Sequence, residues 1–299
     1  MQQMRITILA IIPALVLMGC GGGSGDKPAP SGGPGPVTTG GGDKTALEVT
    51  GVGTIKGRVV YEGTPPKGVD LMPQVEKNEK DAPHCKSDET KNSVTDLTWV
   101  VGKDGGVANV AVWVRPPTGK FFKKPADDKK TYKDEVDVNQ PFCAFVPHVT
   151  VLYSETVDEK TKKLVPTGQK FKFINGAPMA HNTKWAGSEV LQIGGNVNLQ
   201  PKSEHPLALK SDYNQVIRLN CDFHTWMKGY IWALETPYAA VTDKDGNFTI
   251  ENVPAGAELF IVPWHEQALF FWTNGAKGDK VTVKAGETTQ LPDIKVKAK

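Results

Sequence analysis

Apolar and polar positions alternate along several stretches of this chain. Residues 55–61 show this alternation just before a Pro-Pro pair, and residues 107–114 repeat it with valines on one face. A period of two predicts half-buried β-strands, because successive side chains of a strand point to opposite faces. Residues 238–250 hold an Asp-Gly pair between two short apolar stretches, which is a strong hairpin signal. No long stretch has the 3.6-residue period of a helix, so we predict an all-β fold.

The segment from residue 64 to residue 96 has no clear period. Prolines at positions 65, 66, 73 and 83 stand among many charged residues. Because proline lacks the backbone donor that helices and strands use, we predict a long irregular loop here, held in place by Cys85.

The N-terminus has the pattern of an export signal. The apolar run from Ile6 to Met18 is shorter than the ~20 residues that a membrane-spanning helix needs. The run leads into Gly19 and Cys20, a junction similar to the bacterial lipobox. That resemblance implies that residues 1–19 are removed and that Cys20 carries a lipid, so we expect an exported protein anchored to a membrane, in the periplasm or at the cell surface. An ordinary cleaved signal ending near a cysteine is the alternative.

Residues 20–52 are mostly small and polar. Their glycine, proline, serine and threonine content cannot bury enough apolar surface to form a core, so we predict a disordered tether. The rest of the chain, about 250 residues, is long enough for two domains. The whole chain has 35 basic and 33 acidic residues and a formal net charge of +2. This balance gives no indication of nucleic-acid binding.

Residues 219–227 place three kinds of metal ligand within seven positions. Cys221 offers a thiolate, His224 an imidazole and Met227 a thioether. The best candidate for a second imidazole is His181, which follows an alternating apolar stretch and can stand at the end of a neighbouring strand. A trigonal His2Cys site with a weak axial Met is the blue-copper arrangement, so we predict one copper ion. Half of a zinc site is one alternative, although closed zinc sites use four strong N or S ligands. Four unrelated packing residues are another.

The order of these residues resembles that of the cupredoxins, the small blue copper proteins. His181 is followed by Asn182, and Cys221, His224 and Met227 then form a short Cys-x2-His-x2-Met loop of the amicyanin type. The likeness covers about residues 139–236. It implies a Greek-key β-sandwich and gives Asn182 the role of tying the upstream His strand to the Cys loop, as outer hydrogen bonds commonly do around a metal.

The outer segments resemble a second family, the carboxypeptidase regulatory-like, transthyretin-type β-sandwich. The resemblance rests on residues 57–59, 242–250 and 254–256. About three strands precede the copper region and about four follow it, each set too small to close a core, whereas seven strands make an ordinary sandwich. We therefore predict one sandwich split between residues 53–138 and 237–299, with the cupredoxin domain, 139–236, inserted. Two independent domains are the alternative.

Export places the four cysteines where disulfides persist. If lipid takes one and copper another, Cys85 and Cys143 are left, and a disulfide between them is our first expectation. A second metal site is an alternative, since His84 and His148 could join the two thiols to complete a zinc site. Two free thiols are the third possibility.

We expect a single-electron carrier rather than an enzyme. The sequence has no Gly-x-Ser-x-Gly elbow, no His-Glu-x-x-His and no Cys-x-x-Cys-His haem signature. His265-Glu266, at a strand end, looks exposed and is most simply a hydrogen-bonded loop pair. The expected partner is a redox protein that the sequence does not name, with electrons entering through the solvent-facing edge of His224 beside Trp226 and Tyr230. A non-redox surface module, either a copper carrier or a carbohydrate-binding or adhesive sandwich, is the alternative.

Overall fold

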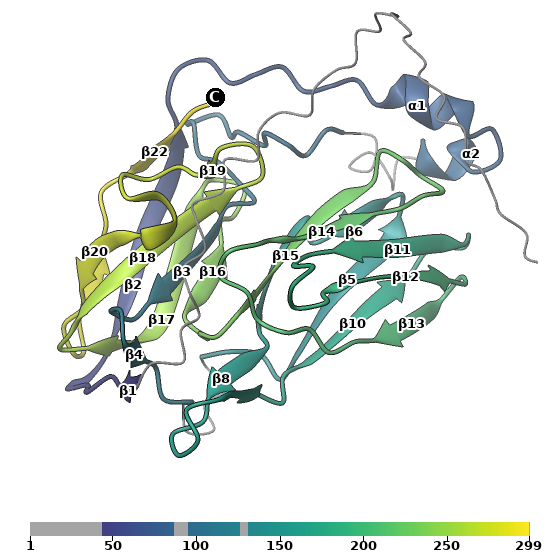
Figure 1. The fold of residues 1–299 in the computed structure, drawn as a ribbon. Helices are drawn as coiled ribbons and strands as arrows, with labels where there is room; N and C mark the ends of the chain where they lie inside the picture. Colours follow the sequence, from purple (N-terminus) through teal and green to yellow (C-terminus); the bar gives the residue numbers. More distant parts are fainter. Residues whose placement is uncertain (1–43, 87–94, 126–130, 299) are drawn as a thin grey trace, which may run out of the picture. The chain divides into compact units, whose positions relative to one another are not determined.

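The computed structural model describes residues 44–86, 95–125 and 131–298, and nearly all of their regular structure is β-strand (Figure 1). The prediction of an all-β sandwich fold is confirmed. No helix in these described ranges is long and apolar enough to cross a membrane. The predicted signal peptide, Cys20 and residues 20–43 of the predicted tether lie outside them.

Two sheets combine strands from the first and last parts of the chain. One is centred on β2 (Gly51–Tyr61), which pairs with β17 (Asn247–Ala255), β21 (Thr288–Gln290) and β22 (Ile294–Val296). The other has the order β16-β3-β18-β19, with β20 also paired to β18. Its strands are β16 (Ala239–Val241), β3 (Ala111–Arg115), β18 (Glu258–His265), β19 (Leu269–Phe270) and β20 (Asp279–Thr282). Apolar side chains of both sheets share one buried core.

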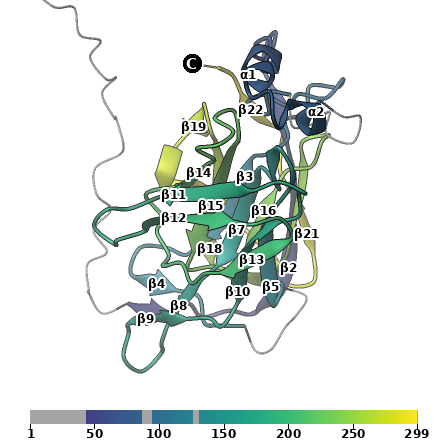
Figure 2. The same cartoon turned by 90° about the vertical axis from the view of Figure 1, so that its right-hand side faces the viewer.

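Two further sheets are built from the central part of the chain. The first has the order β13-β10-β5-β6 and consists of β13 (Ser203–Pro206), β10 (Lys170–Asn175), β5 (Glu135–Phe142) and β6 (Ala144–Val146). The second has the order β12-β11-β14-β15-β7 and consists of β12 (Gly194–Leu199), β11 (His181–Ala186), β14 (Ile217–Asn220), β15 (Lys228–Leu234) and β7 (Val149–Tyr153). Figure 2 shows β11 and β12 side by side, as their antiparallel pairing requires. The predicted boundary at 138/139 falls inside β5, and the domain limits stay a prediction.

Short elements complete the fold. They are β1 (Thr45–Ala46) paired with β4 (Lys120–Phe121), the hairpin β8 (Glu155–Val157) and β9 (Leu164–Pro166), and the 3-10 turn η2 (Gly275–Lys277).

Two short helices occupy the segment that the sequence analysis assigned to an irregular loop. They are α1 (Met72–Lys77) and α2 (Ala82–Cys85), each with a proline in its first two positions. The expectation that no helix forms here is therefore wrong. Six and four residues are too few to show a helical period, and proline is tolerated at a helix start because that N–H has no intrahelical partner. Val75 and Cys85 anchor the two helices in the same apolar cluster as Cys221.

A cluster of tryptophans joins β3 and β18 to β7 and β15. Trp113 and Trp232 lie 4.8 Å apart between ring centroids, and Trp232 and Trp264 lie 5.6 Å apart at a steep angle. All three side chains are at most 2% exposed. This aromatic packing fixes β15, which follows the predicted ligand loop, against the neighbouring sheet.

The side chains of His265 and Glu266 are buried, so the expectation of an exposed pair is wrong. The Glu266 carboxylate lies 2.6 Å from His148 Nε2 and accepts a hydrogen bond from the Tyr230 hydroxyl at 2.8 Å. His265 stacks on Trp99, with 4.0 Å between ring centroids. The packing of residues far apart in sequence closes this strand end off from water.

Candidate metal centre

Strand register brings the predicted ligands to one end of a sheet. The loop 221–227 connects β14 to β15, whose last pair is Asn220 with Lys228. On the other side of β14, Lys184 of β11 pairs with Asn220. Because these strands are antiparallel, the residues before Lys184 run alongside the residues after Asn220. His181, the first residue of β11, therefore stands beside the ligand loop.

Three donor atoms converge there. Cys221 Sγ lies 3.7 Å from His224 Nδ1 and 3.9 Å from His181 Nδ1, and all three atoms lie within 4.8 Å of one another. Metal bonds of about 2.0 Å to nitrogen and about 2.3 Å to sulfur, separated by 120°, would hold S and N about 3.7 Å apart. The spacing of the three donors therefore fits a single ion in a trigonal arrangement.

The three side chains are almost fully buried, with His181 and His224 at 0% and Cys221 at 2% exposure. Burial lowers the pKa of His181 to about 3, with a contribution from repulsion by His224. Burial also lowers the pKa of His224, against the opposing effect of Asp81. Both imidazoles are thus held neutral, which is the form that binds a metal.

Cys221 does not have the surroundings of a catalytic nucleophile. Burial raises the pKa of its thiol, although backbone N–H groups of Asn182, His224 and Phe223 oppose the rise. Reactive cysteines are partly exposed and have a lowered pKa. A buried thiol between two neutral imidazoles instead fits a metal ligand, because metal binding deprotonates the thiol outright.

Asn182 links β11 to the ligand loop. Its Oδ1 accepts a hydrogen bond from the Asp222 backbone N–H at 2.6 Å. Its Nδ2 donates to Asp222 Oδ2 at 3.0 Å and to Asn196 Oδ1 at 2.8 Å. These bonds fix the residue after Cys221 relative to the residue after His181, and so hold the two ligand-bearing segments together.

Met227 closes the loop. Its backbone N–H donates to the His224 carbonyl at 2.9 Å, and its side chain, 2% exposed, belongs to the same apolar cluster as Cys221. The axial role of its thioether stays a prediction.

The edge of His224 opposite Cys221 is covered. Asp81 Oδ2 lies 3.1 Å from His224 Nε2, and Asp81 stands at the start of α2. The expectation of a solvent-facing His224 edge is therefore wrong. Sequence reasoning missed Asp81 because it lies 143 positions before His224, in a segment without a regular pattern. The spacing of the ligand motif contains no signal for it.

Trp226 and Tyr230 do not flank an exposed histidine either. Trp226 is 7% exposed and donates its indole N–H to the Cys143 carbonyl at 3.2 Å, while its ring meets His224 edge-on at 5.3 Å between centroids. Tyr230 is bonded to Glu266.

Cys85 and Cys143 form a disulfide, with 5.5 Å between their Cα atoms. The two sulfurs and a ring nitrogen of His224 lie within 4.8 Å of one another, so the disulfide packs against the ligand site. Sulfurs joined in this way offer no thiolates, and His148 is bonded to Glu266 instead. The second metal site considered from the sequence is not assembled.

No family model and no curated protein matches the sequence. Solved structures similar to this chain include a purple cupredoxin from Nitrosopumilus maritimus, at 11% identity and a TM-score of 0.23, covering 33% of this chain and 97% of that one. Amicyanin from Paracoccus versutus is similar at 13% identity and a TM-score of 0.25, covering 40% of this chain and 96% of that one. At these scores the function of those proteins is not carried over to this chain.

Proposed function

We propose that this protein is a single-electron carrier with one copper ion held by His181, Cys221, His224 and the weak axial ligand Met227. The observation that carries the proposal is the cluster of Cys221 Sγ and two Nδ1 atoms at 3.7 and 3.9 Å in a buried site. Copper bound by such a set supplies a one-electron couple between Cu(II) and Cu(I).

The protein's own residues hold the donors in place. His181 is fixed by the β11 register, Cys221 by the end of β14, and His224 by its bond to Asp81. Asn182 joins the first two segments. A site held from several sides changes little between charge states, which favours rapid electron exchange.

The closed site favours electron transfer over two other uses of a metal. A catalytic metal keeps a position open for water or substrate, and a copper carrier has to release its ion to a recipient. All three convergent donors are at most 2% exposed. This burial supports a carrier of electrons rather than an enzyme or a carrier of copper.

The place of action proposed from the sequence is outside the cytoplasm, on a membrane, through a lipid on Cys20. Expression of the full chain in a bacterium with lipoprotein processing tests this. The native protein is expected in the membrane fraction with its signal peptide removed. The Cys20→Ser variant should either leave the membrane fraction or retain residues 1–19 uncleaved.

Voltammetry of the copper-loaded protein tests the function. A reversible one-electron wave at one copper per chain is expected, together with rapid electron exchange with small redox partners. No turnover of oxygen, nitrite or phenols should accompany it. Sustained catalytic current that depends on Cys221 would contradict the proposal.

A further inference from the structure

The helical segment 71–86 closes the direct route from solvent to His224. Asp81 binds Nε2 of the ring, and the Cys85–Cys143 disulfide packs beside it. His224 itself has no exposed surface. A partner therefore cannot touch the His224 ring directly from this side.

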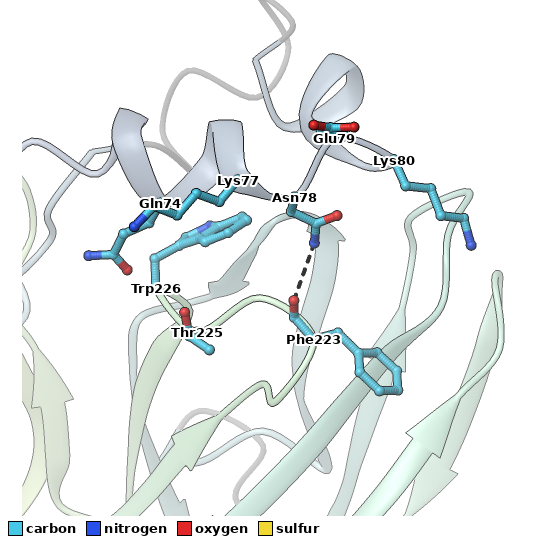
Figure 3. Close-up of a pocket in the computed structure, with 8 residues that line it drawn as sticks. All are labelled: Gln74, Lys77, Asn78, Glu79, Lys80, Phe223, Thr225 and Trp226. Atoms are coloured by element: carbon cyan, nitrogen blue, oxygen red, sulfur yellow. Dashed lines mark hydrogen bonds between the residues drawn. The ribbon is translucent and has the colours of Figure 1, made fainter.

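Phe223 is an exposed part of the ligand loop. It stands between Cys221 and His224 in the chain and is 46% exposed. Among the large apolar side chains that stand out to solvent in the described residues, it is the only aromatic one. Asn78 Nδ2 donates to the Phe223 carbonyl at 3.3 Å and ties the loop to the end of α1 (Figure 3).

Phe223 borders a groove of about 630 Å³ between the helical segment and the ligand loop. Trp226 also lines this groove, and its ring contacts His224 at 5.3 Å between centroids. Two short paths thus connect the groove to the site. One follows the backbone from Phe223 to Cys221 and His224, and the other crosses the contact between the Trp226 and His224 rings.

The charges around the groove favour a negatively charged partner. Lys77 and Lys80 line it, are exposed, and have no ion pair among the described residues. Of the carboxylates nearby in sequence, Glu76 pairs with Lys86 at 2.9 Å, whereas Asp81 contacts the neutral His224 ring and is not among the residues that line the groove. Glu79 does line the groove, so the lining has two lysines and one carboxylate (Figure 3).

We propose that the groove lined by Lys77, Lys80, Phe223 and Trp226 is the docking surface for a redox protein with an acidic face. The inference rests on the proposed electron-carrier function. One electron passes between the partner's redox centre and the metal site, with no bond formed or broken and no proton moved. The lysines steer the approach and Phe223 provides the apolar contact.

Stopped-flow oxidation of the reduced, copper-loaded protein tests this with two probes, anionic ferricyanide and cationic tris(phenanthroline)cobalt(III). Each takes one electron from the protein. The native protein should react faster with ferricyanide than the Lys77→Glu/Lys80→Glu variant does, by about tenfold at low ionic strength, and the cationic probe should show the reverse. Added salt should reduce both effects. The control variant Lys103→Glu/Lys297→Glu has the same net charge change at two exposed lysines elsewhere and should change neither rate by more than about twofold.

Phe223→Ala should slow both probes several-fold, whereas Val190→Ala, at a site 92% exposed, should slow neither. Equal rates in the two lysine variants, or an unchanged rate in Phe223→Ala, would overturn the docking surface. The colour and potential of each variant are measured first. If the native protein takes up no copper or does not cycle between its oxidised and reduced forms, the proposed function is wrong. If it does cycle but its reaction rates do not depend on the groove residues, only the docking surface is wrong.

Discussion

Asp81 Oδ2 lies 3.1 Å from His224 Nε2, although 143 positions separate the two residues in the chain. The contact gives the proposed ligand a carboxylate partner at Nε2, while its Nδ1 faces Cys221, and such a partner would orient the ring and increase its basicity. It also brings a negative charge close to the proposed copper.

Replacing that charge should change the reduction potential. Asp81→Asn keeps an oxygen that can accept a hydrogen bond from Nε2–H but removes the negative charge. That charge favours Cu(II) over Cu(I), so its loss should favour Cu(I). The potential should rise by tens of millivolts, on the order of what one screened charge supplies at this range. Glu79→Gln is the control, because Glu79 is exposed and makes no contact with His224. Equal potentials for the native and Asp81→Asn proteins would show that the carboxylate has no electrostatic role.

Asn182→Ala should weaken copper binding. The substitution removes the bonds to Asp222 and Asn196 and lets the ligand loop move relative to His181. Loss of such an outer partner typically lowers metal affinity 10- to 100-fold. Titration against a competing chelator measures this, with Asn198→Ala on exposed β12 as the matched control. If both variants keep native affinity, the link does not organise the site.

Removing the disulfide should destabilise the protein. Cys85 and Cys143 are 58 positions apart, and the chain-entropy model gives about 4 kcal/mol for a closed loop of that length. The Cys85→Ser/Cys143→Ser variant should therefore unfold at markedly lower denaturant. In the native protein, peptide mapping without reduction should recover the two cysteines in one linked fragment. Alkylation of both thiols in unreduced protein would exclude the bridge.

Acid should destabilise the protein through His265. Burial lowers the pKa of His265 from its ordinary 6.5 to about 4. The unfolded chain then binds a proton that the folded protein does not, so stability is fully present above pH 6.5 and falls as the pH drops toward 4. The difference amounts to roughly 2–3 kcal/mol by pH 4.5. Unfolding at pH 7.5 and pH 4.5 should show a smaller loss for His265→Phe, which keeps a ring against Trp99 but cannot be protonated. The same loss in both proteins would assign the acid sensitivity to other groups.

The donor set could be predicted because its information is local. Cys221 and His224 fall in one short loop, and His181 reaches them through a strand register that alternating patterns already indicate. A thiolate and two imidazoles are ligands that copper binds, and copper stays a proposal that the visible spectrum tests.

The covering of the site could not be predicted in the same way. Asp81 meets His224 through the packing of a segment whose helices are too short for a periodic signal, and Glu266 meets His148 across 118 positions. Both contacts depend on how distant strands and turns pack together, which no local pattern encodes. The expectation of an exposed His224 failed for this reason.

The most direct test of the copper centre is the visible spectrum of residues 44–299 loaded with one equivalent of Cu(II). Charge transfer from a thiolate to Cu(II) requires Cys221 in contact with the metal, so the protein should be intensely blue or green. The colour should disappear in Cys221→Ser, while that variant still folds. A colourless Cu(II)-loaded protein, or equal colour in the serine variant, would contradict the account.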